Sequence, residues 1–519
     1  MRTRTSLFGI MISSLIISAA TAAADGSPTA TVTGGVIRGV PRGAGALFAG
    51  VPYAQPPLGK LRWQPPQPVQ PWTGVREAVR AGPSALQPDL GWNANQRANQ
   101  SEDCLYLNVL TAEWPARGRR PVIVYIHGGA NVGGNGWDHL LKSTTLPEHG
   151  VVLVSLNYRL GVFGFFVHPG LSGESPHRAS GNYGLQDQIA ALRWVRANIG
   201  QFGGDPDNVT VMGQSAGAQD IGLLMASPQA RGLFHRAILE SGPVVSIGAF
   251  GYQSRVDAER AGAEFGRGIG RNDVAELRAV PADELLADAA RLQLRTAPDI
   301  DGWVLEEEPG ATFAAGRAAP IPLLVGSNAR EFTFHGTPDE LRAQIRENFG
   351  ELAPRALRLY GVGDGQTAPA ADPVLGDVGT QFVTDVTFRG SASLLALWHS
   401  AAGRPAWRYQ FSRTPIGHEA AGAAHSAELP YVFGEMVPNE LGADYNAADR
   451  RLSSAMQGYW VNFATTGDPN GKGLAIWPRY DPEKRGYVEF TADGPRAEAG
   501  LRREFIDLFR ARYEQLRLR

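Results

Sequence analysis

The sequence is poor in cysteine, because Cys104 is the only one among 519 residues. A chain with a single cysteine has no internal disulfide, so its stability must come from packing of the core. The segment 104–107, Cys-Leu-Tyr-Leu, is typical of the start of a packed strand. We therefore interpret Cys104 as a buried, inert thiol rather than as a nucleophile.

An excess of charge of either sign is also missing, since 49 basic residues face 51 acidic ones. The chain has no basic run and no alternation of basic and aromatic residues, which excludes nucleic acid as an expected partner. Beyond the N-terminal region, no segment holds the ~18 uninterrupted apolar residues that a transmembrane helix needs. We therefore expect no stable membrane insertion of the mature chain.

Residues 1–24 have the pattern of a secretory signal peptide. Two arginines lie among the first four residues, residues 7–17 are apolar but too few to span a membrane, and residues 22–24 are alanines that offer a cleavage site. The alternative, a retained membrane anchor, is disfavoured by the same short length. We predict that the signal is removed, and that residues 25–519 form one catalytic domain that is exported, to the periplasm or as a secreted protein.

The hydrophobic pattern alternates between strands and helices. Apolar, β-branched runs predict buried strands of a mostly parallel sheet, and apolar positions at helical spacing predict a helix over 184–199. The expected strands are residues 121–126, 151–156, 208–212, 233–239, 321–325 and 407–411, and charged helices are expected at 257–266, 338–360 and 504–517. This order predicts an α/β fold with right-handed crossovers, a doubly wound sheet with helices on both faces, and helical insertions above the sheet.

One serine lies in a motif that is typical of nucleophiles. Gly213-x-Ser215-x-Gly217 lies between a predicted strand and a predicted helix, which is the context that a nucleophile elbow requires. The tight turn needs small neighbours, and it directs the hydroxyl toward the N-terminus of the next helix, where N–H groups favour developing negative charge. The motif alone is weak because glycine and serine are common in turns, but its flanking elements make Ser215 the candidate nucleophile.

A glycine-rich loop follows the predicted strand 121–126. It begins at His127-Gly-Gly-Ala130 and continues with glycines 133, 134 and 136. In hydrolases with a nucleophile elbow, such a loop brings N–H groups to the carbonyl oxygen of the substrate. Small residues let the backbone approach closely. Because this loop and the elbow occur in the expected order, we interpret it as an oxyanion loop rather than as a plain flexible loop.

The nucleophile needs a base and an orienting carboxylate, which follow it in the chain order serine, acid, histidine. Glu331 lies in a loop after a predicted buried strand, where a functional residue of a doubly wound sheet belongs. The rivals Asp299 and Asp301 lie in a Pro-Asp-Ile-Asp-Gly segment, and we interpret them as turn residues. His418 and His425 both lie in a loop of small residues after the strand predicted at 407–411, and spacing alone leaves both open as the base.

These motifs, together with longer blocks, resemble the carboxylesterase/cholinesterase group of α/β hydrolases, often called type B carboxylesterases, and in particular a secreted bacterial member. The resemblance covers nearly the whole mature sequence. Its blocks are FAGVPYAQPPLG (48–59), SEDCLYLN (101–108), NYR (157–159), GLQDQ (184–188) and FGGDP (202–206). It implies the α/β-hydrolase fold, with a central, mostly parallel, doubly wound sheet, and the cleavage of carboxylic esters.

The resemblance also implies roles for single residues. The family's triad acid lies in a block similar to GSNARE (326–331), which supports Glu331, and its histidine lies in one similar to GAAHSAELPYVFG (422–434), which selects His425 over His418. The further residues that it assigns are the oxyanion-hole donors Gly129, Ala130 and Ala216, the structural ion pairs Arg62–Glu102 and Arg159–Asp187, and Ser241 as a support of the triad.

Four positions depart from the family pattern. Gln214 replaces a glutamate that usually precedes the nucleophile, and the lost negative charge argues against a cationic choline ester as substrate. The block 82–87 lacks the cysteine that usually pairs with the one at position 104. Phe332 and Ala130 replace glycines that often follow the triad acid and complete the oxyanion loop. None of these changes removes a catalytic group, and Gln214 is expected to lie beside the triad.

We therefore expect a serine hydrolase that cleaves carboxylic esters to acid and alcohol through an acyl-enzyme on Ser215, with His425 and Glu331 completing the triad. Such chemistry needs no metal and no organic cofactor. The expected partner is a small-molecule ester, and the expected state is a monomer or a weak oligomer. The same triad permits amide cleavage or acyl transfer to an alcohol. The rival from another class is a non-catalytic binding protein on the same fold, which the three filled triad positions disfavour.

Overall fold

The computed structural model describes residues 26–517, apart from short gaps at 144, 249–250, 364 and 437–443. The predicted signal peptide, residues 1–24, lies outside the described residues. Within the described part of the chain, no helix is long and apolar enough to cross a membrane.

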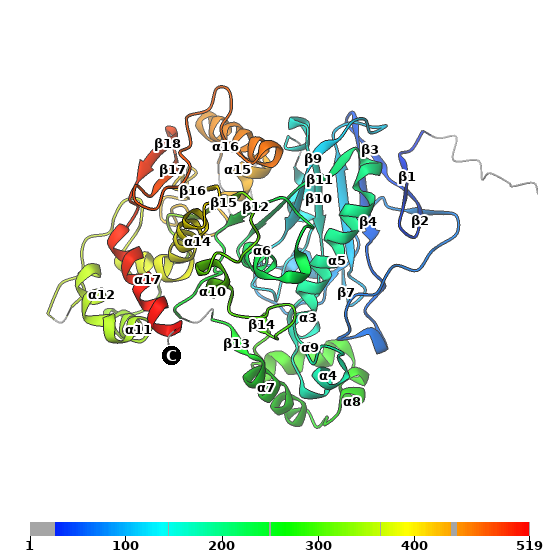
Figure 1. Ribbon diagram of the computed structural model, residues 1–519, viewed down its shortest axis with the longest axis horizontal. Helices are drawn as coiled ribbons and strands as arrows, with labels where there is room; N and C mark the ends of the chain where they lie inside the picture. The colour runs from blue at the N-terminus through cyan, green and yellow to red at the C-terminus, as the bar shows by residue number, and fades with distance from the viewer. Residues whose placement is uncertain (1–25, 144, 249–250, 364, 437–443, 518–519) are drawn as a thin grey trace, which may run out of the picture.

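A large twisted sheet forms the centre of the described chain (Figure 1). Seven consecutive strands of this sheet pair in parallel, and antiparallel strands extend it at both edges. From one edge to the other the strands are β18 (Gly494–Ala499), β17 (Gly486–Thr491), β16 (Ala406–Phe411), β15 (Leu323–Asn328), β12 (Arg236–Glu240), β11 (Gly204–Gln214), β9 (Arg120–Ile126), β10 (Val152–Leu156), β8 (Tyr106–Thr111), β4 (Gly45–Pro52) and β3 (Val40–Arg42). The predicted mostly parallel, doubly wound sheet is confirmed.

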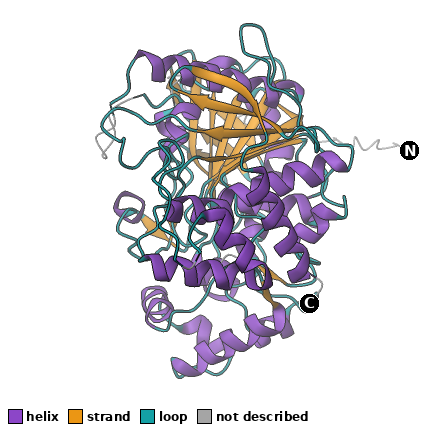
Figure 2. Ribbon diagram, turned by 90° about the vertical axis from the view of Figure 1, so that its left-hand side faces the viewer, coloured by secondary structure: helices purple, strands orange, loops and turns teal. Residues whose placement is uncertain are grey.

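Helices cover both faces of the sheet, and the strand sequences show why (Figure 2). In β9, Val122 and Val124 point into one apolar core, while Ile123 and Tyr125 point into another. Because successive side chains of a strand alternate between faces, an entirely apolar strand needs a cover on each side. The first core includes α5 (Tyr183–Asn198), α6 (Ala216–Ala226) and α14 (Gly390–Ala401), and the second includes α15 (Leu429–Phe433) and α16 (Ala447–Thr466).

Helical insertions come after the strand that leads into Ser215, as the sequence predicted. After β12 the chain forms α7 (Arg255–Gly268), α8 (Val274–Ala279) and α9 (Ala282–Arg291), which gather with α4 (Pro169–Glu174) at one end of the molecule (Figure 1). They surround a small core of their own, which includes Phe166, Phe265 and Leu277. The predicted C-terminal helix is α17 (Arg503–Arg517).

Some predicted boundaries are wrong, and backbone chemistry explains the largest error. The single helix expected at 338–360 is two helices, α11 (Pro338–Phe349) and α12 (Ala353–Tyr360). Gly350 between them has φ +52°, and Pro354 in the first turn of α12 has no N–H with which to continue α11. Strand β12 begins at Arg236 rather than at residue 233, and β11 begins four residues before the predicted start at 208.

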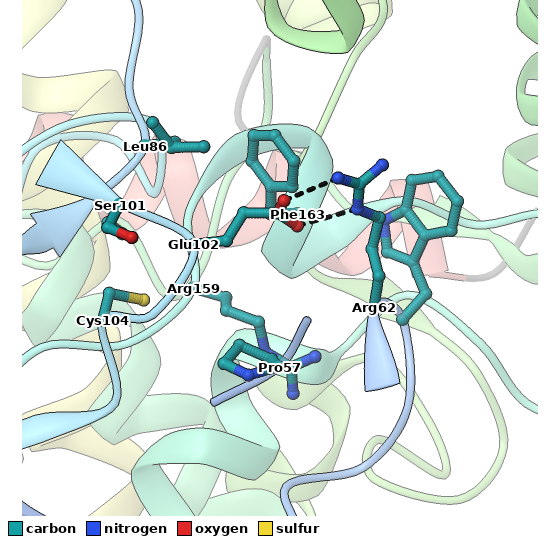
Figure 3. Close-up of a pocket in the computed structure, with 10 residues that line it drawn as sticks. Pro57, Arg62, Leu86, Ser101, Glu102, Cys104, Arg159 and Phe163 are labelled. Atoms are coloured by element: carbon teal, nitrogen blue, oxygen red, sulfur yellow. Dashed lines mark hydrogen bonds and ion pairs between the residues drawn. The ribbon is translucent and has the colours of Figure 1, made fainter. Parts of the chain in front are cut away.

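Three features predicted from the sequence, a thiol and two ion pairs, lie in the interior. Cys104 is 1% exposed, and burial raises the pKa of its thiol well above the usual value, so the thiolate is disfavoured. Arg62 donates from Nε to Glu102 Oε1 at 2.7 Å, beside a cavity that Cys104 and Phe163 also line (Figure 3). The second predicted ion pair, between Arg159 and Asp187, is equally direct. Both implied pairs and the buried thiol are therefore present.

The interpretation of Asp299 as a turn residue is wrong, whereas that of Asp301 is confirmed. Asp301 accepts the N–H groups of Trp303 and Leu305, each at 2.9 Å, as an aspartate does in a turn. Asp299 instead begins the short strand β14 (Asp299–Ile300), and its carboxylate is buried. Neither aspartate was predicted as the triad acid.

Candidate active site

The nucleophile elbow forms where β11 meets α6. Ser215 has φ +57° and ψ −124°, a strained backbone that lies between the last strand residue and the first helix residue. A Cβ atom added to Gly217 would lie 2.1 Å from the carbonyl oxygen of Ile126, and one added to Gly213 would lie 2.7 Å from the carbonyl carbon of Gly217. Only glycine fits at these positions, which explains the motif. The N–H of Ser215 donates to the Glu240 carbonyl oxygen at 2.8 Å and ties the turn to β12.

The three predicted triad residues come together in one chain of hydrogen bonds. The Oγ of Ser215 lies 2.8 Å from His425 Nε2, and His425 Nδ1 lies 2.7 Å from Glu331 Oε2. Glu331 is 1% exposed, and its other carboxylate oxygen accepts the N–H of Asn328 at 2.7 Å. The backbone N–H of His425 also donates to the Glu331 carbonyl oxygen at 2.9 Å. Glu331 is therefore held through both carboxylate oxygens, and it joins His425 through the backbone as well as through the side chains.

The imidazole of His425 has three further neighbours. The rings of Phe332 and Phe388 lie with their centroids 4.6 Å and 4.9 Å from its own. The amide nitrogen of Gln214, which the sequence placed beside the triad, lies 3.2 Å from Nε2. This amide therefore approaches the same ring nitrogen that faces the serine hydroxyl.

The predicted oxyanion loop packs against Ser215. A Cβ atom on Gly128 would lie 2.9 Å from the Cβ of Ser215, so the loop and the elbow are in close contact. Gly129 and Ala130 have φ +113° and +55°, which turns consecutive peptide groups away from ordinary secondary structure. Within the described residues, the N–H groups of Gly129, Ala130 and Ala216 have no hydrogen-bond acceptor. They are free to bind an oxygen atom of a ligand.

Buried polar groups hold the oxyanion loop in place. Asn131 donates from Nδ2 to Asp220 Oδ1 at 2.9 Å, which ties the loop to α6, and Gln188 donates to Asp220 Oδ2 at 2.6 Å. Burial raises the pKa of Asp220 to about 7. The ring of His127 donates from Nδ1 to the Gly128 carbonyl oxygen at 2.8 Å, and burial lowers its pKa to about 4, so this ring is neutral at pH 7.

A second group of carboxylates lies beneath the triad and was missed by the sequence analysis. Asn328 donates from Nδ2 to Glu428, and Trp460 donates from Nε1 to Glu240 Oε1 at 2.8 Å. Burial raises the pKa of Glu428 to about 7, and the Glu331 carboxylate adds to that rise. A sequence signal was present, since Asn328 and Glu428 lie in the same two blocks that carry the acid and the histidine.

Ser241 is the predicted residue with the least direct link to the triad. Its N–H donates to the Gly326 carbonyl oxygen at 2.9 Å, and it has φ +53°. Its hydroxyl is buried and has no hydrogen-bond partner within the described residues. As for metals, no group of three or more His, Cys, Asp or Glu side chains within the described residues is placed to hold an ion.

The site combines a half-buried serine in a turn at the end of a parallel strand, an adjoining histidine and carboxylate, and a glycine loop. These features together define a serine hydrolase of the α/β-hydrolase type. The family comparison agrees with this class, because the model of the carboxylesterase family matches residues 26–358 and 366–509. The chain belongs to the carboxylesterase family and is a carboxylic ester hydrolase.

Individual relatives support the same class. The fumonisin B1 esterase of Sphingopyxis macrogoltabida is 36% identical over 467 residues, which cover 88% of this chain and 84% of the relative. The para-nitrobenzyl esterase of Bacillus subtilis is 37% identical over 470 residues, covering 87% of this chain and 92% of the relative. A solved PNB esterase structure aligns with a TM-score of 0.81 at 35% identity, covering 93% of this chain and 99% of that one. A carboxylesterase structure from Geobacillus stearothermophilus aligns with a TM-score of 0.80 at 34% identity and the same coverage.

Proposed function

We propose that Ser215, His425 and Glu331 are the catalytic triad of this ester hydrolase. The observation that carries the proposal is the unbroken chain of hydrogen bonds from Ser215 Oγ through the imidazole to the Glu331 carboxylate, 2.8 Å and 2.7 Å long. The strained elbow presents the serine at the carboxyl end of the central strand β11, where it is half-buried and open to a ligand. A histidine within hydrogen-bond reach of a hydroxyl, and oriented by a carboxylate, is the arrangement that activates a serine nucleophile.

The reaction proceeds in two halves. The Ser215 oxygen attacks the ester carbonyl carbon as its proton passes to His425 Nε2, and a tetrahedral intermediate forms. The alcohol then leaves with that proton, and the acyl group remains on the serine. Water, deprotonated by the same nitrogen, attacks the acyl carbon and releases the acid, and the proton returns to the serine. Glu331 keeps the imidazole in the required tautomer through Nδ1–H and stabilises its charged form.

The oxyanion of each tetrahedral intermediate is bound by the N–H groups of Gly129, Ala130 and Ala216. All three lack an acceptor within the described residues, and the last stands at the N-terminus of α6, where the helix dipole adds positive potential. Removal of one donor of this kind from a serine hydrolase typically costs about 3 kcal/mol of transition-state stabilisation. The brace between Asn131 and Asp220 keeps this loop in the geometry that the transition state needs.

Two neighbours support the triad without taking part in bond changes. Gln214, the residue before Ser215, places its amide nitrogen 3.2 Å from His425 Nε2 and so borders the ring beside the serine hydroxyl. Ser241 joins β12 to the strand that leads to Glu331 through its bond to Gly326. Because Gln214 is neutral, the site holds no carboxylate at this position to attract a cationic alcohol group. The proposed substrate is a small ester of an uncharged alcohol, and the proposed state is a monomer or weak oligomer.

We further propose that the enzyme is exported and acts in the periplasm or outside the cell. The support is the sequence pattern of residues 1–24. Mass spectrometry of the intact protein, purified from the periplasm or medium of a bacterial host, should give a chain that begins at or close to Asp25. A full-length N-terminus on exported protein would contradict cleavage.

The test of the catalytic proposal is hydrolysis of p-nitrophenyl esters of short and long acids by the wild type and by Ser215→Ala. The expected loss in kcat is at least about 10⁴-fold, since removal of a triad member leaves only the contributions of the oxyanion hole and binding. Equal melting temperatures of the two proteins would show that the fold is retained. Activity that survives in a folded Ser215→Ala variant would mean that another residue is the nucleophile.

A further inference from the structure

An exposed aromatic ring lies on the proposed catalytic base. Phe332 follows the proposed triad acid directly in the chain, at a position where the family pattern often has a glycine, and its side chain is 43% exposed. Its ring centroid lies 4.6 Å from that of His425, with 40° between the ring planes. Phe388 contacts the same imidazole at 4.9 Å but is only 2% exposed. The imidazole is therefore bordered by one buried phenyl ring and by one that is open to a ligand.

The chemistry of the reaction decides which part of the substrate meets this ring. His425 must deliver a proton to the departing alcohol oxygen, so that oxygen lies within about 3 Å of Nε2 when the tetrahedral intermediate breaks down. The carbonyl oxygen is directed the other way, toward the N–H groups of the oxyanion loop. A group attached to the alcohol oxygen therefore extends past the imidazole, where the open face of Phe332 lies. The acyl chain is attached to the carbonyl carbon that Ser215 attacks, and the reaction does not require it to pass this ring.

A second exposed aromatic side chain lies against the oxyanion loop. Trp92 is 57% exposed, and its ring approaches to 3.3 Å of the position that a Cβ atom of Gly129 would occupy. Its ring also lies 3.2 Å from the position of a Cβ atom on Gly133, so Trp92 packs against the oxyanion loop. Of these two exposed rings, that of Phe332 contacts the imidazole of the proposed base, which carries the nitrogen that protonates the leaving alcohol.

We propose that Phe332 is a specificity-determining residue that recognises an aromatic group on the alcohol side of the ester. This inference rests on the proposed triad. The preferred substrates are esters of arylmethyl alcohols, whose ring stacks edge-on or offset on Phe332 while the carbonyl occupies the oxyanion hole. Paired aromatic rings contribute beyond the area that they bury, and saturated rings of equal size do not share this part of the interaction.

The test compares two matched pairs of esters by their kcat/KM values. Benzyl acetate and cyclohexylmethyl acetate differ only in the aromaticity of the alcohol, and methyl phenylacetate and methyl cyclohexylacetate differ only in that of the acid. For the wild type, benzyl acetate is expected to be favoured over its saturated partner by roughly 2- to 10-fold, the range of one aromatic pair. Phe332→Leu keeps an apolar side chain and is expected to bring this ratio to about 1, whereas Phe332→Tyr is expected to restore it.

Trp92→Leu is the matched control, because it removes an exposed aromatic ring that lies against the oxyanion loop instead of against His425. It is expected to retain the wild-type ratio for the acetate pair. An acetate ratio that is unchanged in Phe332→Leu, or a change confined to the two methyl esters, would overturn the assignment to the alcohol side. Failure of the proposed function is distinguishable: in that case the folded wild type cleaves none of the four esters, or Ser215→Ala cleaves them equally well.

Discussion

The substitution Glu331→Gln tests the proposed triad most sharply, because both carboxylate oxygens have defined partners. Oε2 faces His425 Nδ1 at 2.7 Å, and Oε1 accepts the N–H of Asn328 at 2.7 Å. A glutamine has one acceptor oxygen and one NH₂ group for these two positions. If its NH₂ group faces Asn328, two donors meet in a buried site, which costs about 1–3 kcal/mol. The amide therefore turns its oxygen to Asn328 and its NH₂ group to His425.

This orientation removes the base without disturbing the fold. An NH₂ group opposite Nδ1 requires that nitrogen to be an acceptor, so the imidazole proton moves to Nε2, which faces Ser215 Oγ at 2.8 Å. An Nε2–H group cannot accept the serine proton. We expect kcat to fall about 10⁴-fold, as when the equivalent carboxylate of another serine hydrolase is changed to its amide. At 1.36 kcal/mol for each factor of ten, this loss corresponds to about 5.5 kcal/mol.

The assay is steady-state hydrolysis of p-nitrophenyl acetate, with a single-turnover experiment to separate acylation from deacylation. The control is Glu306→Gln, which makes the same chemical change at an exposed position and should retain wild-type kcat. Melting temperatures of both variants should lie close to that of the wild type. A folded Glu331→Gln variant with less than a tenfold loss in kcat would refute the proposal that this carboxylate sets the tautomer of His425.

Two further predictions concern buried charge. Burial raises the pKa of Asp220 to about 7, so the folded protein binds a proton more tightly than the unfolded chain, and this residue lowers stability progressively from about pH 4 to pH 7, by at most about 1.4 kcal/mol per pH unit. Asp220→Asn removes that dependence, and Gln188 can turn its unpaired amide oxygen to the new NH₂ group. The difference in melting temperature, variant minus wild type, should therefore be larger at pH 8 than at pH 5. An equal difference at both pH values would contradict this. Arg159→Leu leaves the Asp187 carboxylate buried without its two 2.8 Å bonds from the guanidinium, and should lower the free energy of unfolding by about 3–5 kcal/mol in urea titrations followed by tryptophan fluorescence. A loss below about 1 kcal/mol would mean that water reaches and solvates this pair.

Much of the fold was predictable because its signals are local. The strand at 121–126 is apolar on both faces, which indicates a buried parallel strand, and β9 (Arg120–Ile126) is that strand. The helix predicted over 184–199 is α5, within one residue at each end. Predictions failed where two local preferences compete over a few residues. The break between α11 and α12 depends on Gly350 and Pro354. The helical spacing of the apolar residues continues across these two positions, so the pattern predicted one helix.

The candidate site divides in the same way. The elbow at Ser215 and the loop at Gly129 could be read from the sequence, because a strained turn and a close backbone approach permit only a few residue types at adjacent positions. The choice between His418 and His425 was open from spacing and was made by resemblance alone, since the histidine and the serine are 210 residues apart in the chain. No local pattern encodes a contact across that distance, because it depends on how loops close over the packed sheet.

The sequence by itself therefore determined the class of fold and pointed to the candidate nucleophile and the candidate oxyanion loop, each of which follows from the conformational limits of short segments. The tertiary structure alone decided which distant side chains meet. It placed Asp220 under Asn131, 89 residues away in the chain, and it left the ring of Phe332 exposed against His425. Burial and contact are properties of the folded chain as a whole, so the electrostatics and the specificity of the site become visible only when its segments are packed together.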